Sequence, residues 1–321
     1  MTGEHTMSVP EIRQHAVHVA EATGADVLVD QALGPHLSMR VGGVVPALIK
    51  PTSPDMAADV VRRLVAASVP HRLLGGGSNV LADDSGLDFV VVHLGAATMR
   101  SCWSGTDVLA PAGMTMAALL REATQAGLSG LEWAAGLPGT IGGAVVGNAG
   151  AFGGETAQSV RSVRLMAADG STREHVVAPG DFGYRHSFVR PGEIVLEVTL
   201  RLVPSTVAAV RAEADRVNRT RAASQPKGGH SSGCVFRNAP EAPAGKLVDE
   251  CGLKGRRRGG AFVSPTHGNF IINDGSASAQ DILQLIDEVR AEVLRQKGVE
   301  LQLEVNIWSG TPTADGSGRE T

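Results

Sequence analysis

The sequence predicts an α+β protein of more than one domain, on three observations. The chain has 321 residues, more than one ordinary domain needs. Short apolar runs typical of strands alternate with amphipathic helical segments along most of its length. Two glycine-rich stretches, residues 75–81 and 127–155, interrupt this alternation. Because glycine adopts φ > 0 and allows close approach of a ligand to the backbone, both stretches are candidate ligand loops.

The first part of the chain predicts an α/β unit. Ser8 and Glu11 form a capping-box pattern that predicts a helix start, and Ser53 followed by Pro54 predicts a second. Apolar spacing extends these helices over residues 8–22 and 53–67, and strands are expected at residues 44–50, 71–74 and 89–94.

The first glycine stretch, GGGSNVL, follows directly on the strand expected at residues 71–74. Its backbone N–H groups would form a natural nest for an anion. The pattern lacks the spacing of a Rossmann fingerprint and the lysine of a P-loop. The alternative is a tight hairpin-like turn, although three consecutive glycines exceed what such a turn requires.

The rest of the chain predicts further elements in a mixed order. A helix is expected at residues 115–126, with Gly127 after its end, and an Asp169–Gly170 turn predicts a hairpin. Strands are expected at residues 107–111, 162–168, 172–177, 193–202 and 300–308 and near Ala261 and Phe270, and helices at residues 207–224, 244–251 and 278–297. We expect a last domain from about residue 205, and a disordered tail from Gly310.

Composition excludes several classes of function. The net charge of −4, the pI near 6.2 and the 3% of aromatic residues argue against nucleic acid as a partner. Three cysteines, Cys102, Cys234 and Cys251, form no C-x-x-C pair, which argues against a disulfide framework and a metal site. Neither a signal peptide nor a membrane span is visible. We therefore expect a cytoplasmic protein with no membrane partner. We also expect a monomer, although composition does not determine the oligomeric state.

Four further segments carry a resemblance to a known family. They are FGYRHS at residues 182–187, SGCVFRN at 232–238, AGKL at 244–247 and LEV at 303–305. Together with the two glycine motifs, and in this order, they resemble UDP-N-acetylenolpyruvoylglucosamine reductase, the MurB family. The resemblance covers about residues 33–309, and ordered motifs are far more specific than one glycine cluster, which alone is as often an ordinary Ala/Gly loop.

The resemblance implies a fold and an activity. The fold is the FAD-binding type shared with vanillyl-alcohol oxidase, with FAD-binding subdomains at residues 25–95 and 96–204. A substrate-binding α+β domain would follow at residues 205–309, with residues 1–24 as an N-terminal extension and residues 310–321 as a disordered tail. The implied activity belongs to peptidoglycan precursor synthesis. NADPH reduces a non-covalently held FAD, which passes hydride to the enolpyruvyl ether of a UDP-sugar and so gives UDP-N-acetylmuramate.

The resemblance also assigns the cofactor residues. The FAD pyrophosphate is expected at Gly75, Gly76, Gly77, Ser78, Asn79, Val80 and Leu81. The rest of the FAD site is expected at Arg40, Pro138, Gly139, Thr140, Gly142, Gly143, Asn148 and Ala149.

Arg185 fits the chemistry that such a reaction requires. Hydride addition to an enol ether that carries a carboxylate builds negative charge on the neighbouring carbon and on the carboxylate, so a cation must stabilise it and an acid must quench it. Arginine offers a permanently charged, bidentate fork for a carboxylate. The alternative is a surface arginine on a hairpin.

Cys234 stands where many family members carry the serine that protonates the intermediate. A thiol is a stronger acid than a serine hydroxyl, so proton donation stays possible. Burial would keep Cys234 protonated, whereas a charged His230 would lower its pKa. The alternative is a small buried hydrophobic residue. Glu304 is expected to act with Cys234, and alternation along residues 301–307 places it on a polar face, which suits a site or plain solvent equally.

Substrate contacts are expected, by resemblance, from Tyr184, Asn238, His267 and Lys254. The basic run of Arg256, Arg257 and Arg258 suggests a diphosphate site, but we favour a solvated face. Three departures from the family pattern stand out. Asn306 replaces a common arginine, Ser224 replaces a lysine, and the link from residue 187 to 194 is too short for the tyrosine-bearing lid of the longer subclass.

Two other functions remain open at this point. Asn306 favours a relative on the same FAD scaffold, an oxidase or reductase that acts on another substrate. A flavin- or nucleotide-binding module without catalysis would require Arg185, Cys234 and Glu304 to be incidental.

Overall fold

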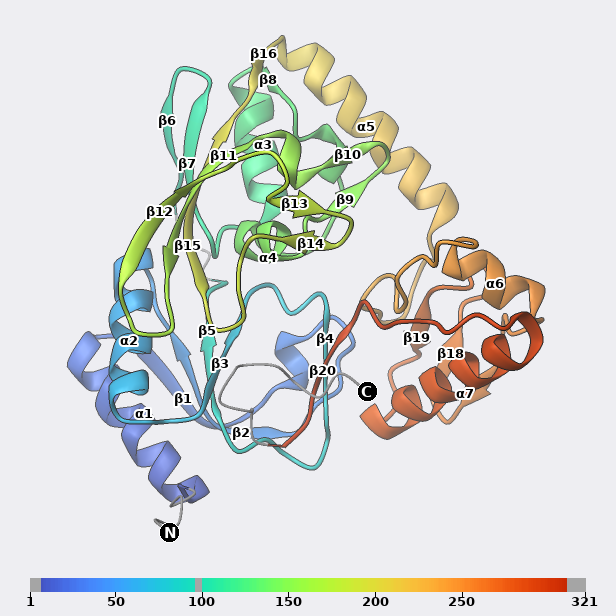
Figure 1. The fold of residues 1–321 in the computed structure, drawn as a ribbon, viewed down its shortest axis with the longest axis horizontal. Helices are drawn as coiled ribbons and strands as arrows, with labels where there is room; N and C mark the ends of the chain where they lie inside the picture. Colours follow the sequence, from blue (N-terminus) through green and yellow to red (C-terminus); the bar gives the residue numbers. More distant parts are fainter. Residues whose placement is uncertain (1–6, 96–99, 311–321) are drawn as a thin grey trace.

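Figure 1 shows a larger lobe with two sheets and a smaller C-terminal lobe, drawn in orange and red. The long helix α5 (Val207–Ser224) leads from the first lobe to the second. The computed structural model describes residues 7–95 and 100–310.

The first sheet has the strand order β1-β2-β5-β3. Its strands are β1 (Asp26–Ala32), β2 (Val44–Lys50), β3 (His71–Leu74) and β5 (Val90–His93). The last three run parallel, and β1 adds an antiparallel edge. Helices α1 (Val9–Thr23) and α2 (Pro54–Ala66) bury their apolar faces against alternate residues of β2 and β5. Because parallel strands end on the same side of a sheet, the glycines after β3 lie at the edge where ligands usually bind.

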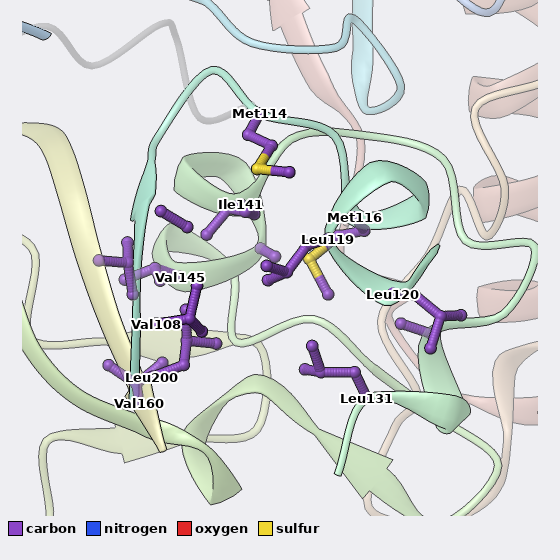
Figure 2. Packing of buried hydrophobic residues seen from close by; sticks show 14 of the residues in the cluster. Val108, Met114, Met116, Leu119, Leu120, Leu131, Ile141, Val145, Val160 and Leu200 are labelled. Carbon is purple, nitrogen blue, oxygen red and sulfur yellow. The ribbon is translucent and has the colours of Figure 1, made fainter. Parts of the chain in front are cut away.

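The second sheet is antiparallel, in the order β12-β11-β15-β7-β6. Its strands are β6 (Cys102–Ser104), β7 (Asp107–Pro111), β11 (Val160–Met166), β12 (Thr172–Val176) and β15 (Ile194–Arg201). Helices α3 (Met116–Gln125) and α4 (Ile141–Val146) cover one face of it, and Figure 2 shows Met116, Leu119, Ile141 and Val145 packed in this core. This core holds α4 in place, and α4 lies within the glycine-rich stretch of residues 127–155.

The glycine-rich stretch of residues 127–155 is folded rather than an open loop. Its elements are β8 (Leu128–Ser129), η2 (Glu132–Ala134), α4, β9 (Gly150–Ala151) and β10 (Gly154–Glu155), followed by η3 (Thr156–Gln158). Close packing explains the glycines, since a Cβ on Gly154 would lie 2.4 Å from Cγ of Trp133. After β12 the chain forms the short hairpin of β13 (Phe182–Gly183) and β14 (His186–Ser187) and then β15, and β16 (Val203–Pro204) pairs with β8.

The C-terminal lobe has its own apolar core and one strand in the larger lobe. Its elements are α6 (Ala244–Glu250), β17 (Arg257–Arg258), β18 (Ala261–Val263), β19 (Ile271–Asn273) and α7 (Ala279–Lys297). The final strand, β20 (Asn306–Trp308), pairs in parallel with β4 (Val80–Ala82), directly after the first glycine motif. A short 3-10 turn, η1 (Gly34–His36), lies next to that motif in space, and Met39, Val41 and Leu81 join the core of the C-terminal lobe.

The structure confirms every helix predicted from the sequence and differs at several strands. Only residues 306–308 of the strand predicted over residues 300–308 form a strand, because Leu303 makes one isolated bridge, to Phe236, while Leu301 is buried in the core. Val80 and Leu81 extend into β4 instead of ending a turn. The exposed edge strands β1 and β6 were not predicted. The domain boundaries stay predictions, and most of the predicted tail lies outside the described residues.

Two absences concern the described residues alone. Over residues 7–95 and 100–310, no helix is both long and apolar enough to cross a bilayer. In the same residues, no group of three or more His, Cys, Asp and Glu side chains is arranged to hold a metal ion.

Candidate active site

The two glycine motifs lie against each other at the edge of the first sheet. We call residues 75–79 the first glycine loop and residues 138–143 the second. A Cβ added to Gly76 would lie 2.8 Å from Cα of Gly139, and one added to Gly75 would lie 2.5 Å from Oγ1 of Thr140. Side chains at these positions would therefore separate the loops. The two loops, 59 or more residues apart in sequence (from residue 79 to residue 138), form one surface of backbone.

Gly77 is confined from the opposite side. Its φ is +61°, and an added Cβ would lie 2.1 Å from the carbonyl oxygen of His36. Its own carbonyl accepts a hydrogen bond from the Ser38 amide at 2.9 Å. Only glycine fits this conformation and this space.

The first glycine loop presents hydrogen-bond donors. Within the described residues, no recorded hydrogen bond uses the amides of Gly76, Gly77 and Ser78 as donors. Consecutive amides without side chains in front of them form an anion nest. This donor set fits the diphosphate of a dinucleotide such as FAD, and the first loop would hold it. The second loop packs behind it, where Gly142 donates to Ala112 at 2.9 Å.

Two asparagines form hydrogen bonds to segments that carry predicted catalytic residues. Asn79 ends the first glycine loop, and Asn148 lies in the glycine-rich stretch of residues 127–155. Nδ2 of Asn79 donates to the carbonyl of Glu304 at 2.8 Å, and the Asn79 carbonyl accepts from the Asn306 amide at 3.0 Å. Nδ2 of Asn148 donates to the carbonyl of Gly183 at 3.0 Å and to Glu155 at 3.1 Å, while its Oδ1 accepts from the Ala157 amide. The side chain of Asn148 is thus engaged within the protein.

Arg185 and Glu304, 119 residues apart, form an ion pair. Nε of Arg185 lies 2.6 Å from Oε1 of Glu304, and the two side chains are 24% and 18% exposed. In the described chain, no recorded ion pair or hydrogen bond engages the two terminal amino groups of Arg185, which leaves a fork of donors for a carboxylate. The guanidinium carbon lies 5.4 Å from the ring centroid of Tyr184.

Cys234 lies beside this pair. The Glu304 amide donates to the carbonyl of Val235 at 2.8 Å, which brings the two segments together. Burial, reinforced by the charge of Glu304 and opposed by that of Arg185, raises the pKa of the Cys234 thiol to about 11. The thiol is therefore protonated at neutral pH, as expected if burial dominates. The structure thus brings all three predicted catalytic residues together.

Glu304 has a second cationic neighbour that sequence reasoning missed. Burial raises the pKa of Glu304, while Arg185 and then Arg237 act in the opposite direction. Arg237 belongs to the motif at residues 232–238, and its amide donates to the carbonyl of Gln302 at 2.8 Å. The only sequence signal for this neighbour was the positive charge of Arg237 inside that motif. Ser232, in the same motif, has a buried hydroxyl without a hydrogen-bond partner in the described chain.

The predicted substrate residues surround α6. The Tyr184 hydroxyl accepts from the Asn238 amide at 3.2 Å, and Oδ1 of Asn238 accepts from the amide of Ala244, the first residue of α6. Nζ of Lys254 lies 2.6 Å from Oδ2 of Asp249. A Cβ on Gly245 would lie 3.0 Å from the ring of His267, and burial followed by the charge of Lys254 lowers the pKa of that imidazole.

The remaining predicted residues lie around the two loops or apart from them. Arg40 has a φ of +58° and donates through Nη1 to the carbonyl of Pro35 at 2.5 Å. The Ala149 carbonyl accepts from Thr156, and the Leu81 side chain is buried in the apolar core. The roles of Val80, Pro138, Gly143 and these residues in FAD binding stay predictions. The exposed run of Arg256, Arg257 and Arg258 pairs with Glu288 and Asp274.

Comparison with known proteins accounts for both lobes. A family model for an FAD-binding domain matches residues 45–175. A second model, for the C-terminal domain of UDP-N-acetylenolpyruvoylglucosamine reductase, matches residues 225–308.

Whole proteins match over nearly their full length. UDP-N-acetylenolpyruvoylglucosamine reductase of Caulobacter vibrioides is 39% identical over 87% of this chain and 93% of its own, and that of Moorella thermoacetica is 40% identical over 88% and 93%. The crystal structure of the reductase (MurB) from Thermus caldophilus superposes with a TM-score of 0.74, at 34% identity over 89% of this chain and 99% of that one. The chain therefore belongs to the UDP-N-acetylenolpyruvoylglucosamine reductase (MurB) family of FAD-dependent oxidoreductases.

Proposed function

We propose that this protein reduces the enolpyruvyl ether of UDP-N-acetylglucosamine enolpyruvate to UDP-N-acetylmuramate, a step of peptidoglycan precursor synthesis. The observation that carries the proposal is the meeting of Arg185, Glu304 and Cys234 beside the two glycine loops. When bound, FAD reduced by NADPH supplies the hydride. Gly76, Gly77 and Ser78 would hold its diphosphate through their amides.

Arg185 orients the substrate and stabilises the charge that develops. The terminal amino groups of the guanidinium would bind the carboxylate of the enolpyruvyl group in a bidentate manner. As hydride reaches the terminal carbon, negative charge builds on the neighbouring carbon and its carboxylate, so this contact strengthens in the transition state. Glu304, through Nε of Arg185, fixes the direction of the fork.

Cys234 completes the reaction as the proton donor. Its thiol carries a proton at neutral pH because burial raises its pKa to about 11. Transfer of this proton to the carbanionic carbon of the substrate gives the lactyl ether, and a proton from solvent then restores the thiol. Glu304 acts on the same thiol through its charge, which favours the protonated form before transfer.

The substrate's sugar nucleotide would lie along α6, where Tyr184, Asn238, Lys254 and His267 gather. We further propose that the enzyme works as a cytoplasmic monomer, with residues 205–309 as the substrate-binding domain. Three free cysteines suit a reducing compartment. Sedimentation at several concentrations tests the monomer, and a rise in mass with concentration would refute it.

The two half-reactions test the function. Purified protein should be yellow, release FAD on denaturation and bleach under anaerobic conditions when NADPH is added. The UDP-enolpyruvyl sugar should then restore the colour much faster than oxygen does, with UDP-N-acetylmuramate as product. Protein that takes up no FAD would exclude the proposal.

A reductase or oxidase for another substrate is the second candidate, and Asn306 favours it. The Asn306 side chain is exposed and donates to the Asn79 carbonyl at 3.3 Å, at the position where the family resemblance leads us to expect an arginine. Faster reoxidation by oxygen than by the UDP-sugar would establish this candidate instead.

A further inference from the structure

Arg185 depends on a small hairpin for its position. It follows Tyr184 in the turn between β13 and β14, and its φ is +55°. A non-glycine residue in the left-handed region is strained and persists only where its surroundings hold it. The inner side of the hairpin is held by Asn148, which bonds Gly183, and by Ser187, whose Oγ donates to the carbonyl of Val146 at 2.9 Å.

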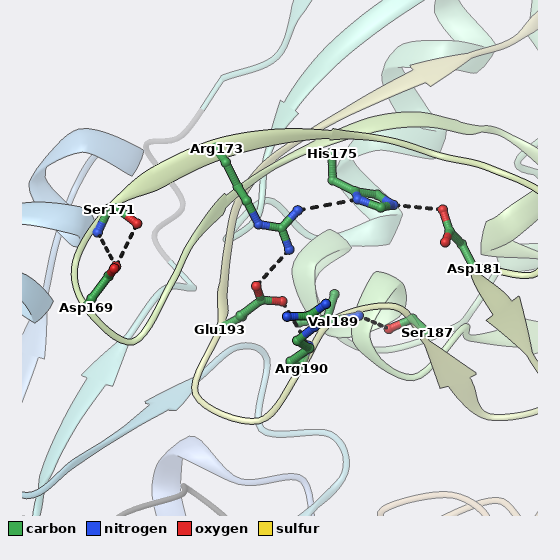
Figure 3. A network of polar contacts seen from close by, with 9 residues as sticks. All are labelled: Asp169, Ser171, Arg173, His175, Asp181, Ser187, Val189, Arg190 and Glu193. Atoms are coloured by element: carbon green, nitrogen blue, oxygen red, sulfur yellow. Dashed lines mark hydrogen bonds and ion pairs between the residues drawn. The ribbon is translucent and has the colours of Figure 1, made fainter.

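His175, on β12, contacts the hairpin at both of its ends. Nε2 of His175 lies 2.7 Å from Oδ2 of Asp181, the residue before β13. The same imidazole stacks on Phe188, the residue after β14, with ring centroids 3.9 Å apart and planes 19° apart. Figure 3 shows His175 between Arg173 and Asp181. One side chain therefore spans the base of the hairpin that carries Arg185.

The partners of His175 are themselves fixed. The Ala178 amide donates to Oδ2 of Asp181 at 2.7 Å. This bond, together with that to His175, lowers the pKa of Asp181, so it is a carboxylate at neutral pH. On the other side of the imidazole, Nη1 of Arg173 lies 3.4 Å from Nδ1 of His175. Nη2 of the same arginine lies 2.7 Å from Oε1 of Glu193 (Figure 3). Glu193 in turn accepts from the Arg190 amide, in the segment that follows Phe188.

We propose that His175, with Asp181 and Phe188, is a positioning residue that holds Arg185 in register with Glu304 and the substrate carboxylate. The inference rests on the proposed role of Arg185. His175 contacts neither Glu304 nor any predicted substrate residue through a recorded bond in the described chain, so its effect passes through the hairpin. A displacement of about 1 Å at a reacting group lowers rates by as much as 100-fold.

Two variants remove the contact between His175 and Asp181 while they preserve the shape of the side chains. His175→Phe keeps an aromatic ring for stacking on Phe188 but loses the bond to Asp181. Asp181→Asn keeps the size of the side chain and removes its charge. We expect each to lower the rate at which the UDP-enolpyruvyl sugar reoxidises the reduced enzyme by about 10- to 100-fold. FAD content and Tm show whether either variant fails to fold. If one of them does, the reoxidation rate of the other variant tests the proposal.

A double-mutant cycle with Arg185→Ala distinguishes positioning from a general structural effect. In an Arg185→Ala background there is no guanidinium to position, so His175→Phe and Asp181→Asn should change the rate less than twofold. If either variant lowers the rate by the same factor in both backgrounds, His175 is only structural and the inference is overturned. If Arg185→Ala alone leaves the rate unchanged, the role proposed for Arg185 fails first.

Glu174→Gln is the matched control. Glu174 is the neighbour of His175 on β12, and its carboxylate accepts from Oγ of Ser162 on β11, away from the hairpin. The substitution should leave the reoxidation rate within twofold of the original. A loss as large as that of His175→Phe would show that any change on β12 has this effect and would overturn the inference.

Discussion

The two glycine loops and the cluster of Arg185, Cys234 and Glu304 meet at one place but are built differently. The loops consist of backbone, and their fit depends on the absence of side chains at Gly76 and Gly77. The cluster consists of side chains from three distant segments, and its chemistry depends on their charges. FAD binding by the loops should therefore be lost when a side chain is added. The reaction at the cluster should instead be lost when a charge or the proton donor is removed.

Gly77→Ala should have the largest effect. The added Cβ would lie 2.1 Å from the His36 carbonyl oxygen, so the loop must move and its amides would no longer converge. We expect colourless protein with little bound FAD, measured from the flavin absorbance of the purified protein. Strain at φ > 0 alone costs only about 1–2 kcal/mol, so the steric clash is the dominant cause.

Gly105→Ala is the control for this clash. Gly105 has a φ of +60°, close to that of Gly77, but among the described residues no atom beyond its two chain neighbours lies within 4 Å of its added Cβ. The variant should have a lower Tm and keep its full content of FAD. Equal loss of FAD in both variants would show that backbone strain, not close packing, sets the requirement for glycine.

Cys234→Ala should affect one half-reaction only. Loss of the proton donor should slow reoxidation by the UDP-enolpyruvyl sugar by about 100- to 10,000-fold, the usual contribution of a general acid. Flavin reduction by NADPH should continue at its original rate, and Cys234→Ser should retain part of the turnover. Stopped-flow absorbance follows both steps, and equal loss in the two steps would mean that Cys234 is structural.

Substitutions of its charged neighbours should move the pKa of Cys234 in opposite directions. Burial is the main cause that raises this pKa to about 11, the charge of Glu304 adds to the rise, and the charge of Arg185 opposes it. Glu304→Gln should therefore give a lower value and Arg185→Gln a higher one. The pH dependence of alkylation by iodoacetamide reports the value, in protein whose other cysteines, Cys102 and Cys251, are replaced.

The same values set a pH dependence of turnover. The reactive form of Cys234 is the protonated thiol, which is present below the pKa and lost above it. The reoxidation rate should therefore fall as pH rises through about 11 in the original enzyme and at a lower pH in Glu304→Gln. Alkylation profiles that do not move in either variant would contradict the proximity of the three residues.

Sequence patterns predicted the regular elements well where local signals are strong. The capping box of Ser8 and Glu11 marked the start of α1, Ser53 and Pro54 marked the start of α2, and Gly127 marked the end of α3. The edge strand β1 has a mostly exposed burial pattern, so it lacks the apolar alternation that predicts a strand. The pairing of β20 with β4 joins residues more than 220 positions apart, and no local pattern contains that information.

Sequence motifs predicted which residues form the site but not the contacts that hold them in place. The resemblance placed Arg185, Cys234 and Glu304 in one site, and the three residues lie together in the structure, while their catalytic roles stay predictions. The resemblance did not predict two features of the site. The side chains of Asn79 and Asn148 bond catalytic segments, and His175 reaches the Arg185 hairpin through tertiary packing. Both depend on how distant strands are arranged, which spacing along the chain does not encode.

Substitutions in the basic run of Arg256, Arg257 and Arg258 should have the smallest effect. Arg256 and Arg258 pair with Glu288 on α7, and Arg257 pairs with Asp274, while all three side chains remain about half exposed. Exposed pairs of this kind contribute little, and arginines already engaged by carboxylates have less to offer a diphosphate. Arg257→Gln and Arg258→Gln should therefore leave the KM for the UDP-sugar within twofold. A rise of tenfold would mean that the diphosphate competes with Glu288 and Asp274 for these side chains and would move the substrate site from α6 towards β17.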